Sequence, residues 1–114
     1  INVTCATDDM KNMFYPFGTM NPLEVVHIAA HAGYLTTKDL LRSAFEMPLY
    51  NAARLFHVED YGIVEGNTAN LLILPVNSIV DAIRFHPSPT LVMRRGRVIV
   101  QTEVQREMDL SIPT

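Results

Sequence analysis

The sequence lacks tryptophan, has one cysteine and is poor in charge. Of its 114 residues 18% are charged and 48% are hydrophobic, which is typical of a packed globular chain and argues against disorder. A formal net charge of −3 gives no electrostatic reason to expect nucleic acid or an anionic membrane as a partner. No apolar run approaches the length of a membrane span, so we expect no membrane partner.

The single cysteine, Cys5, has no partner for an internal disulfide, so we expect a reducing compartment and a cytoplasmic protein. Inside an expected strand it is interpreted as a small buried hydrophobic residue. The sequence also has no glycine-rich phosphate loop and no nucleophile elbow. The chain does not begin with Met, and its first residues resemble a strand from the middle of a domain, so we expect a fragment of a larger protein.

The first half predicts a strand followed by helices. Residues 1–7 alternate β-branched residues with smaller or polar ones, which predicts a strand. A loop is expected over residues 10–20, which contain breakers. Asn21, followed by proline at the first helical position, predicts the start of an apolar helix that ends near Gly33.

Thr36 with Asp39 forms a capping signal at the start of TKDLLRSAFE, which predicts a second helix. Pro48 should end or kink this helix, and PLYNAARLF should restart it. The order strand, loop, helix, helix over residues 1–56 is the pattern of one α/β barrel unit with an extra helix.

The second half, residues 57–114, predicts a β-rich portion of about five short strands, part of a small sandwich. NLLILP reads as a short buried strand, and SIVDAIRFH as a strand of ambiguous periodicity. PTLVMRRGRVIVQTEV is the clearest hairpin, with its turn at Arg95–Gly96. The arginines around that turn are interpreted as a solvated tip.

Two adjacent carboxylates, Asp8 and Asp9, directly follow the expected first strand. Aspartate is common in turns, so a role as a cap or turn residue is open. In α/β barrels, however, residues at the C-terminal ends of strands point into the active-site mouth. A carboxylate there could bind a metal and pass protons to and from a metal-bound water, while its neighbour meets a substrate.

An aromatic cluster of Phe14, Tyr15 and Phe17 follows the acidic pair. These side chains could be core, or they could form a stacking lid over a flat heterocycle beside a polar pocket.

The predicted apolar helix places Glu24, His27 and His31 on one face, at spacings of three and four. Such a face can ligate zinc or a di-iron centre. No metalloprotease motif is present, and a buried helix also satisfies histidine by hydrogen bonding, so we interpret these residues as structural.

Several segments carry a family resemblance: a strand ending in TDD, FYPFGTMNPLEVVHIAAH, LYNAARLF, DYGIVEGNTANLLILP and the hairpin with RRGRVI. Over its whole length the sequence resembles the C-terminal third of the amidohydrolase superfamily, and within it the cytosine deaminase-like branch. At position 70 the chain has asparagine where many amidohydrolases have aspartate, and asparagine at this position is similar to the cytosine deaminase-like branch.

The resemblance implies a fold, a (β/α)8 barrel with a small β-sandwich. Residues 1–56 would be the last βα unit of the barrel, and residues 57–114 would be strands of the sandwich. It also implies hydrolytic deamination of a cytosine-like ring with a divalent metal, Zn or Fe. Asp8 would be the catalytic proton shuttle and a metal ligand, Asp9 would contact the heterocyclic substrate, and Phe14 would pack over the ring.

Departures from the branch leave alternatives open. Thr7 stands where the bacterial enzymes carry histidine, and the next loop residues also differ, so a substituted triazine or another cyclic amidine is an alternative substrate. The His-x-His pair and the two later metal histidines of the family are absent from this chain. A non-catalytic truncated fragment with a structural or association role is therefore the second hypothesis. We expect the chain alone to be inactive, and marginal or aggregation-prone unless the missing barrel segment or a homo-oligomer completes it.

Overall fold

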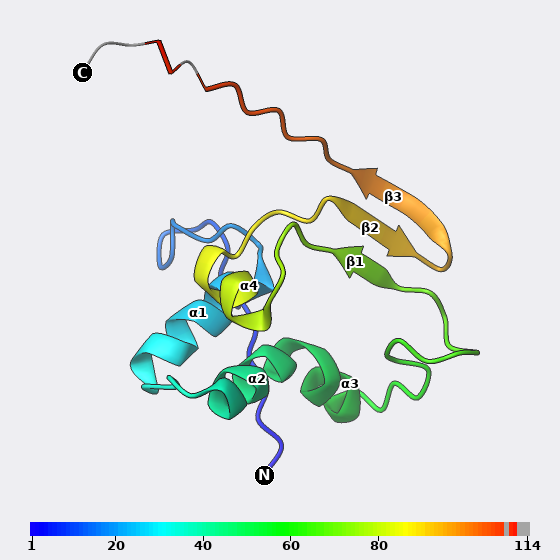
Figure 1. Cartoon of the computed structure of the whole chain (residues 1–114). Helices are drawn as coiled ribbons and strands as arrows, with labels where there is room; N and C mark the ends of the chain where they lie inside the picture. The colour runs from blue at the N-terminus through cyan, green and yellow to red at the C-terminus, as the bar shows by residue number, and fades with distance from the viewer. Residues whose placement is uncertain (109, 112–114) are drawn as a thin grey trace.

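The structure is a computed structural model that describes residues 1–108 and 110–111. It combines a group of helices with a small antiparallel sheet that lies to one side of them (Figure 1). The elements in chain order are α1 (Pro22–Ala32), α2 (Lys38–Glu46), the π-helical turn η1 (Met47–Asn51), α3 (Ala52–Leu55), β1 (Leu71–Ile73), α4 (Ile79–Phe85), β2 (Leu91–Arg94) and β3 (Arg97–Gln101).

Helix α1 begins where the sequence predicts. The Asn21 side chain accepts a hydrogen bond from the backbone N–H of Leu23 at 3.0 Å, so it caps the helix. At the other end Tyr34, rather than Gly33, takes the left-handed conformation, with φ 51°. The N–H of Leu35 then reaches back over this turn to a carbonyl in the last turn of the helix, which satisfies it.

Helix α2 begins one residue later than the capping signal predicts. The cap is Thr37, not Thr36, and its side chain accepts from the N–H of Leu40. Pro48 does not end the helical path. Because proline has no N–H to donate, α2 ends at Glu46, the chain widens into η1, and the α-helix restarts as α3, which confirms the predicted restart.

The core lies where α1, α2 and α4 meet, and it is small. Its buried members are Val26, Ala30, Ala44 and Ile83. Cys5 is half-buried and packs against this cluster, and its burial raises the pKa of the thiol. A thiol held protonated in this way fits the interpretation of Cys5 as a packing residue.

The prediction of a strand over residues 1–7 is wrong for this structure: no described strand includes these residues. A strand exists only through hydrogen bonds to a neighbour, and among the described residues none forms such a ladder with this segment. Side-chain amides hold it instead. Asn2 Nδ2 donates to the Asn51 carbonyl at 2.9 Å, and Asn51 Nδ2 donates to the Val3 carbonyl at 2.8 Å.

The prediction of a strand over residues 78–86 is also wrong, because this segment forms α4. Ser78 is its N-cap: the hydroxyl accepts from the N–H of Asp81 at 3.0 Å and lies 2.9 Å from the Asp81 carboxylate. Ala82 and Ile83 are buried, which is the helical spacing of an apolar face from Ile79 onward.

The sheet has the order β1-β2-β3, antiparallel throughout, so the described residues contain three strands where about five were expected. The β2–β3 hairpin is confirmed, and it turns where Arg95 and Gly96 both have positive φ. Helices together with a small antiparallel sheet match the coarse α/β prediction. None of the helices in the described ranges is long and apolar enough to cross a membrane.

Candidate active site

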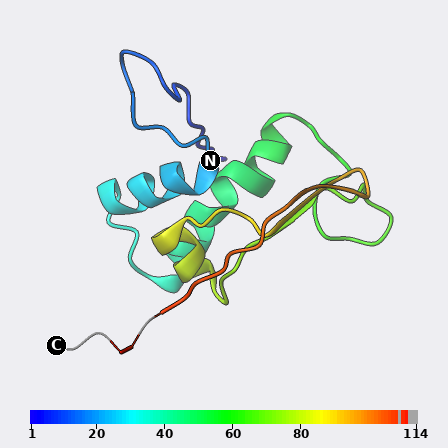
Figure 2. The same ribbon diagram turned by 90° about the horizontal axis from the view of Figure 1, so that it is seen from above.

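A shallow pocket of about 280 Å³ lies between the end of the N-terminal segment and α1. It is lined by the carboxylates Asp8, Asp9 and Glu24, together with Tyr15 and two apolar residues of α1. Seen from above, the blue loop of residues 10–20 projects away from the helices (Figure 2). Tyr15 and Gly18 of this loop line the pocket. The structure therefore brings the two predicted carboxylates to one hollow, with the expected loop at its edge.

Asp8 has an unusual backbone and an exposed carboxylate. Its φ is 49°, a left-handed conformation that costs a residue with a side chain about 1 kcal/mol. Aspartate often offsets this cost with a local hydrogen bond, but within the described residues no hydrogen bond involves the Asp8 side chain. The reading of Asp8 as a cap is not supported, and its carboxylate is free to meet another group.

Asp9 is half-buried and is held by its own loop. Asn12 Nδ2 donates a short hydrogen bond to Asp9 Oδ1. Asn12 Oδ1 in turn accepts from the backbone N–H groups of Phe14 at 2.9 Å and Tyr15 at 3.0 Å. The turn role that aspartate residues commonly play thus applies to Asp9, and it leaves the second carboxylate oxygen uncommitted.

The three residues of the predicted aromatic cluster have different positions relative to the pocket. Tyr15 lines the pocket, and Phe17 packs edge-on against it with ring centroids 6.2 Å apart. Phe14 does not line the pocket: its side chain is 86% exposed on the projecting loop. None of the three is core, so the packing alternative is not supported for Phe14.

Glu24 fastens the far end of the loop to α1. One of its carboxylate oxygens accepts from the Thr19 N–H at 3.0 Å and the Thr19 hydroxyl at 2.7 Å, and the other lies 3.4 Å from the Tyr15 hydroxyl. The hydrogen bonds from Thr19 lower the pKa of Glu24, and the electrostatic interaction with His86 adds to the effect. The sequence placed Glu24 on a helix face that can ligate metal and that was interpreted as structural; its observed partners are the loop residues Tyr15 and Thr19.

The Glu24 anchor should weaken in acid. A carboxylate whose pKa is lower in the folded state stabilises the fold above its ordinary pKa, and this contribution is lost as pH falls through the folded-state pKa. We expect hydrogen-exchange protection factors at the Thr19 amide to fall as the pH is lowered below the ordinary pKa of glutamate. In Glu24→Gln, protection should start lower and stay nearly constant over this range. An equal pH dependence in Glu24→Gln would contradict the assignment.

The two histidines of α1 are engaged with backbone. His27 Nδ1 lies 3.0 Å from the Ile83 carbonyl, and His31 Nδ1 lies 3.1 Å from the His27 carbonyl. His86 stacks edge-on against His27, with ring centroids 5.2 Å apart. These bonds agree with the structural interpretation of His27 and His31.

The described part of the chain does not fit a metal ion. Among these residues no group of three histidine, cysteine, aspartate or glutamate side chains is placed to hold one. Asp8 supplies at most one ligand, whereas a catalytic zinc needs about three from protein. A metal at this site would depend on ligands from outside these 114 residues.

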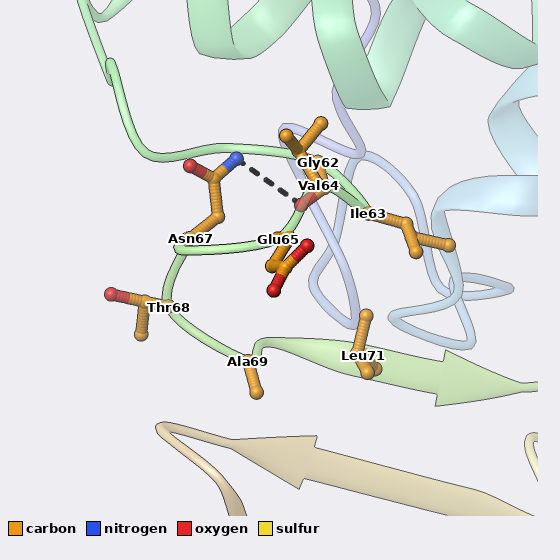
Figure 3. Close-up of a pocket in the computed structure, with 8 residues that line it drawn as sticks. All are labelled: Gly62, Ile63, Val64, Glu65, Asn67, Thr68, Ala69 and Leu71. Carbon is orange, nitrogen blue, oxygen red and sulfur yellow. Dashed lines mark hydrogen bonds between the residues drawn. The ribbon is translucent and has the colours of Figure 1, made fainter.

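A second pocket, of about 240 Å³, lies in the loop before β1 (Figure 3). Its walls include Ile63, Val64 and Leu71, and Asn67 Nδ2 donates to the Gly62 carbonyl at 3.3 Å. Glu65 is the one ionisable side chain among its lining residues. A single acid without a partner base gives this pocket a weaker case for catalysis than the acidic pocket beside α1.

No protein-family model matches the chain. A curated relative, N-isopropylammelide isopropyl amidohydrolase from Pseudomonas sp. (strain ADP), is 31% identical over 105 residues. The match covers 91% of this chain and 26% of that protein.

Solved structures give the same picture. Two crystal structures of 5-methylcytosine deaminase from Klebsiella pneumoniae, liganded with phosphonocytosine and with 5-fluorocytosine, match with TM-scores of 0.85 and 0.86. Each is 33% identical to this chain, and each match covers 96% of this chain and 27% of the deaminase chain. The fold also matches N-isopropylammelide isopropylaminohydrolase from Burkholderia multivorans, with a TM-score of 0.74, 23% identity and 79% of this chain covered.

The chain spans about a quarter of the length of the relatives it matches. Nearly all of this chain takes part in the match, so the similarity is not confined to one motif. These findings confirm the resemblance predicted from the sequence: the chain is similar to part of a cytosine deaminase and to part of an amidohydrolase, both of the amidohydrolase superfamily.

Proposed function

We propose that this chain forms the C-terminal part of an amidohydrolase that hydrolytically deaminates a cytosine-like ring. The observation that carries the proposal is the acidic pocket beside α1. There Asp8, whose carboxylate makes no hydrogen bond within the described residues, adjoins a held carboxylate, Asp9. The 33% identity to a deaminase liganded with cytosine analogues supports the choice of ring.

In this proposal Asp8 moves protons. A water molecule adds to the ring carbon that bears the amino group, and the Asp8 carboxylate accepts the proton that the water loses. The same carboxyl group then gives this proton to the amino nitrogen. The carbon–nitrogen bond breaks and ammonia leaves with this proton. The second proton of the water moves from the new hydroxyl to the ring nitrogen, which leaves a ring carbonyl, so atoms and charge balance. A carboxylate without a hydrogen-bond partner is suited to carry the proton in both directions.

Asp9 and Phe14 would hold the substrate. The uncommitted oxygen of Asp9 is an acceptor for a ring N–H, and the exposed Phe14 ring can pack on the face of a flat heterocycle. The metal that the family resemblance implies, Zn or Fe, would have Asp8 as one ligand. Because the described residues do not fit a metal by themselves, no step is derived through it.

The proposal extends to the remainder of the protein. Residues 1–56 would be the last βα unit of a barrel, and residues 57–114 would belong to a β-sandwich, completed by a further segment or by a homo-oligomer. The N-terminal segment, which forms no ladder with a described strand, and the exposed loop aromatics support this arrangement, because both offer surface to a neighbour.

A substituted triazine is the second candidate substrate. It is favoured by the 31% identity to N-isopropylammelide isopropyl amidohydrolase. Such a ring is also flat and rich in nitrogen, so Asp9 and Phe14 would meet it in the same way. A direct comparison of cytosine, 5-methylcytosine and N-isopropylammelide as substrates decides between the two rings.

The proposal can be tested in a chimera in which this chain replaces the matching quarter of the Klebsiella 5-methylcytosine deaminase. We expect Phe14→Ala in this chimera to raise KM about tenfold with kcat nearly unchanged, because loss of ring stacking costs about 1 kcal/mol and loss of apolar contact adds to it. Phe17→Ala removes a similarly exposed aromatic of the same loop and should leave KM within about twofold. An unchanged KM in Phe14→Ala would remove the stacking role.

A further inference from the structure

Asn12 lies between Asp9 and Phe14, the two residues proposed to hold the substrate, and its side chain forms hydrogen bonds with both. Its Nδ2 donates to Asp9 Oδ1, and its Oδ1 accepts from the Phe14 N–H at 2.9 Å and the Tyr15 N–H at 3.0 Å. The backbone N–H of Asn12 also lies 3.3 Å from the Tyr15 carbonyl. One side chain thus joins the carboxylate of the pocket to the backbone of the aromatic segment.

The chemistry of the partners allows one orientation of the Asn12 amide. A carboxylate oxygen needs a donor, and two backbone N–H groups need an acceptor. If the amide were reversed, its oxygen would face the Asp9 carboxylate and its NH₂ would face two further donors. The network therefore requires an amide at position 12: aspartate could accept from the backbone, but it could not donate to Asp9.

We propose that Asn12 is a positioning residue that sets Asp9 and Phe14 in a single arrangement toward the substrate. This inference rests on the proposed function. With Oδ1 of Asp9 occupied by Asn12, the second oxygen is presented as an oriented acceptor. The site then selects a ring that offers an N–H donor on the edge facing Asp9 while its face lies against Phe14.

Two substitutions separate the two halves of this role. Asn12→Asp keeps an acceptor for the Phe14 and Tyr15 N–H groups, but it replaces the donor to Asp9 with a second negative charge. Asn12→Ala removes both halves. Lys11→Ala is the matched control, since Lys11 is the exposed neighbour and bonds to neither residue.

In the chimera assayed with 5-fluorocytosine, we expect Asn12→Asp to raise KM tenfold to a hundredfold with kcat within about threefold, the size expected for loss of a hydrogen bond to a charged group. Hydrogen exchange of the chimera should show protected Phe14 and Tyr15 amides in the wild type and in Asn12→Asp. Asn12→Ala should raise exchange at these two amides at least tenfold and raise KM as well. Lys11→Ala should change neither quantity.

The outcomes separate this inference from the function on which it rests. A wild-type KM in Asn12→Asp, or unchanged exchange at Phe14 and Tyr15 in Asn12→Ala, overturns the role of Asn12 even if the chimera is active. A chimera that turns over none of the offered rings overturns the proposed function, and the exchange measurement still decides whether Asn12 orders the loop. A fall in kcat alone, with KM and exchange unchanged, also overturns the positioning role.

Discussion

Replacing Asp8 with asparagine should lower kcat/KM of the chimera by about 10²- to 10⁴-fold, the contribution that a positioned acid–base group makes. Asparagine keeps the size of the side chain and tolerates the left-handed backbone at position 8, so the fold should persist. It cannot take up and return a proton, so the chemical step should fail while substrate still binds.

The Asp8→Asn result needs a control for charge. Asp39→Asn removes an exposed carboxylate in the first turn of α2, away from the acidic pocket, and should leave kcat/KM within about twofold. Circular dichroism should show that both variants fold like the wild type. Turnover in Asp8→Asn equal to that of Asp39→Asn would remove Asp8 from the mechanism.

Placing a charge in the helical core should unfold the chain. Ile83 is 4% exposed and packs with Val26, Ala30 and Ala44 where three helices meet. No buried polar or charged side chain is found among the described residues to pair with a carboxylate there. Ile83→Asp should cost about 3–5 kcal/mol, the range for an uncompensated buried charge, which is a large fraction of the free energy of unfolding of a small domain.

Val80→Asp on the same helix is the matched control. Val80 is 42% exposed and lies in the first turn of α4, where a negative charge is favourable to the helix. We expect its urea midpoint to stay close to the wild-type value, while Ile83→Asp should show little cooperative transition. Equal midpoints for the two variants would show that the contact of α4 with α1 and α2 does not hold the fold.

The segments that the sequence predicts correctly are those whose structure is determined by residues close in the sequence. Asn21 followed by proline places the start of α1, and the Arg95–Gly96 turn places the hairpin. The sequence of residues 78–86 predicts a strand wrongly, because its apolar residues are too few to distinguish the strand period from the helix period. In the structure the cap at Ser78 starts a helix. Residues 1–7 have strand composition, but pairing depends on a neighbour that local sequence cannot supply.

The candidate site is also only partly predictable from the sequence. Asp8 and Asp9 could be singled out from sequence because two adjacent carboxylates after a β-like segment are unusual. The roles of Asn12 and Glu24 could not, because each depends on how the loop of residues 10–20 folds back on itself and on α1. An asparagine three residues after Asp9 and two before Phe14 was the available signal, since such side chains often bond to nearby backbone.

Release of ammonia from cytosine and 5-methylcytosine by the chimera, with release of isopropylamine from N-isopropylammelide measured in parallel, tests the central claim most directly. The account predicts stoichiometric ammonia from at least one of the cytosine-type rings, and loss of that release in Asp8→Asn. A folded chimera that releases no ammonia from either cytosine-type ring, or releases it equally well without the Asp8 carboxylate, would contradict the claim.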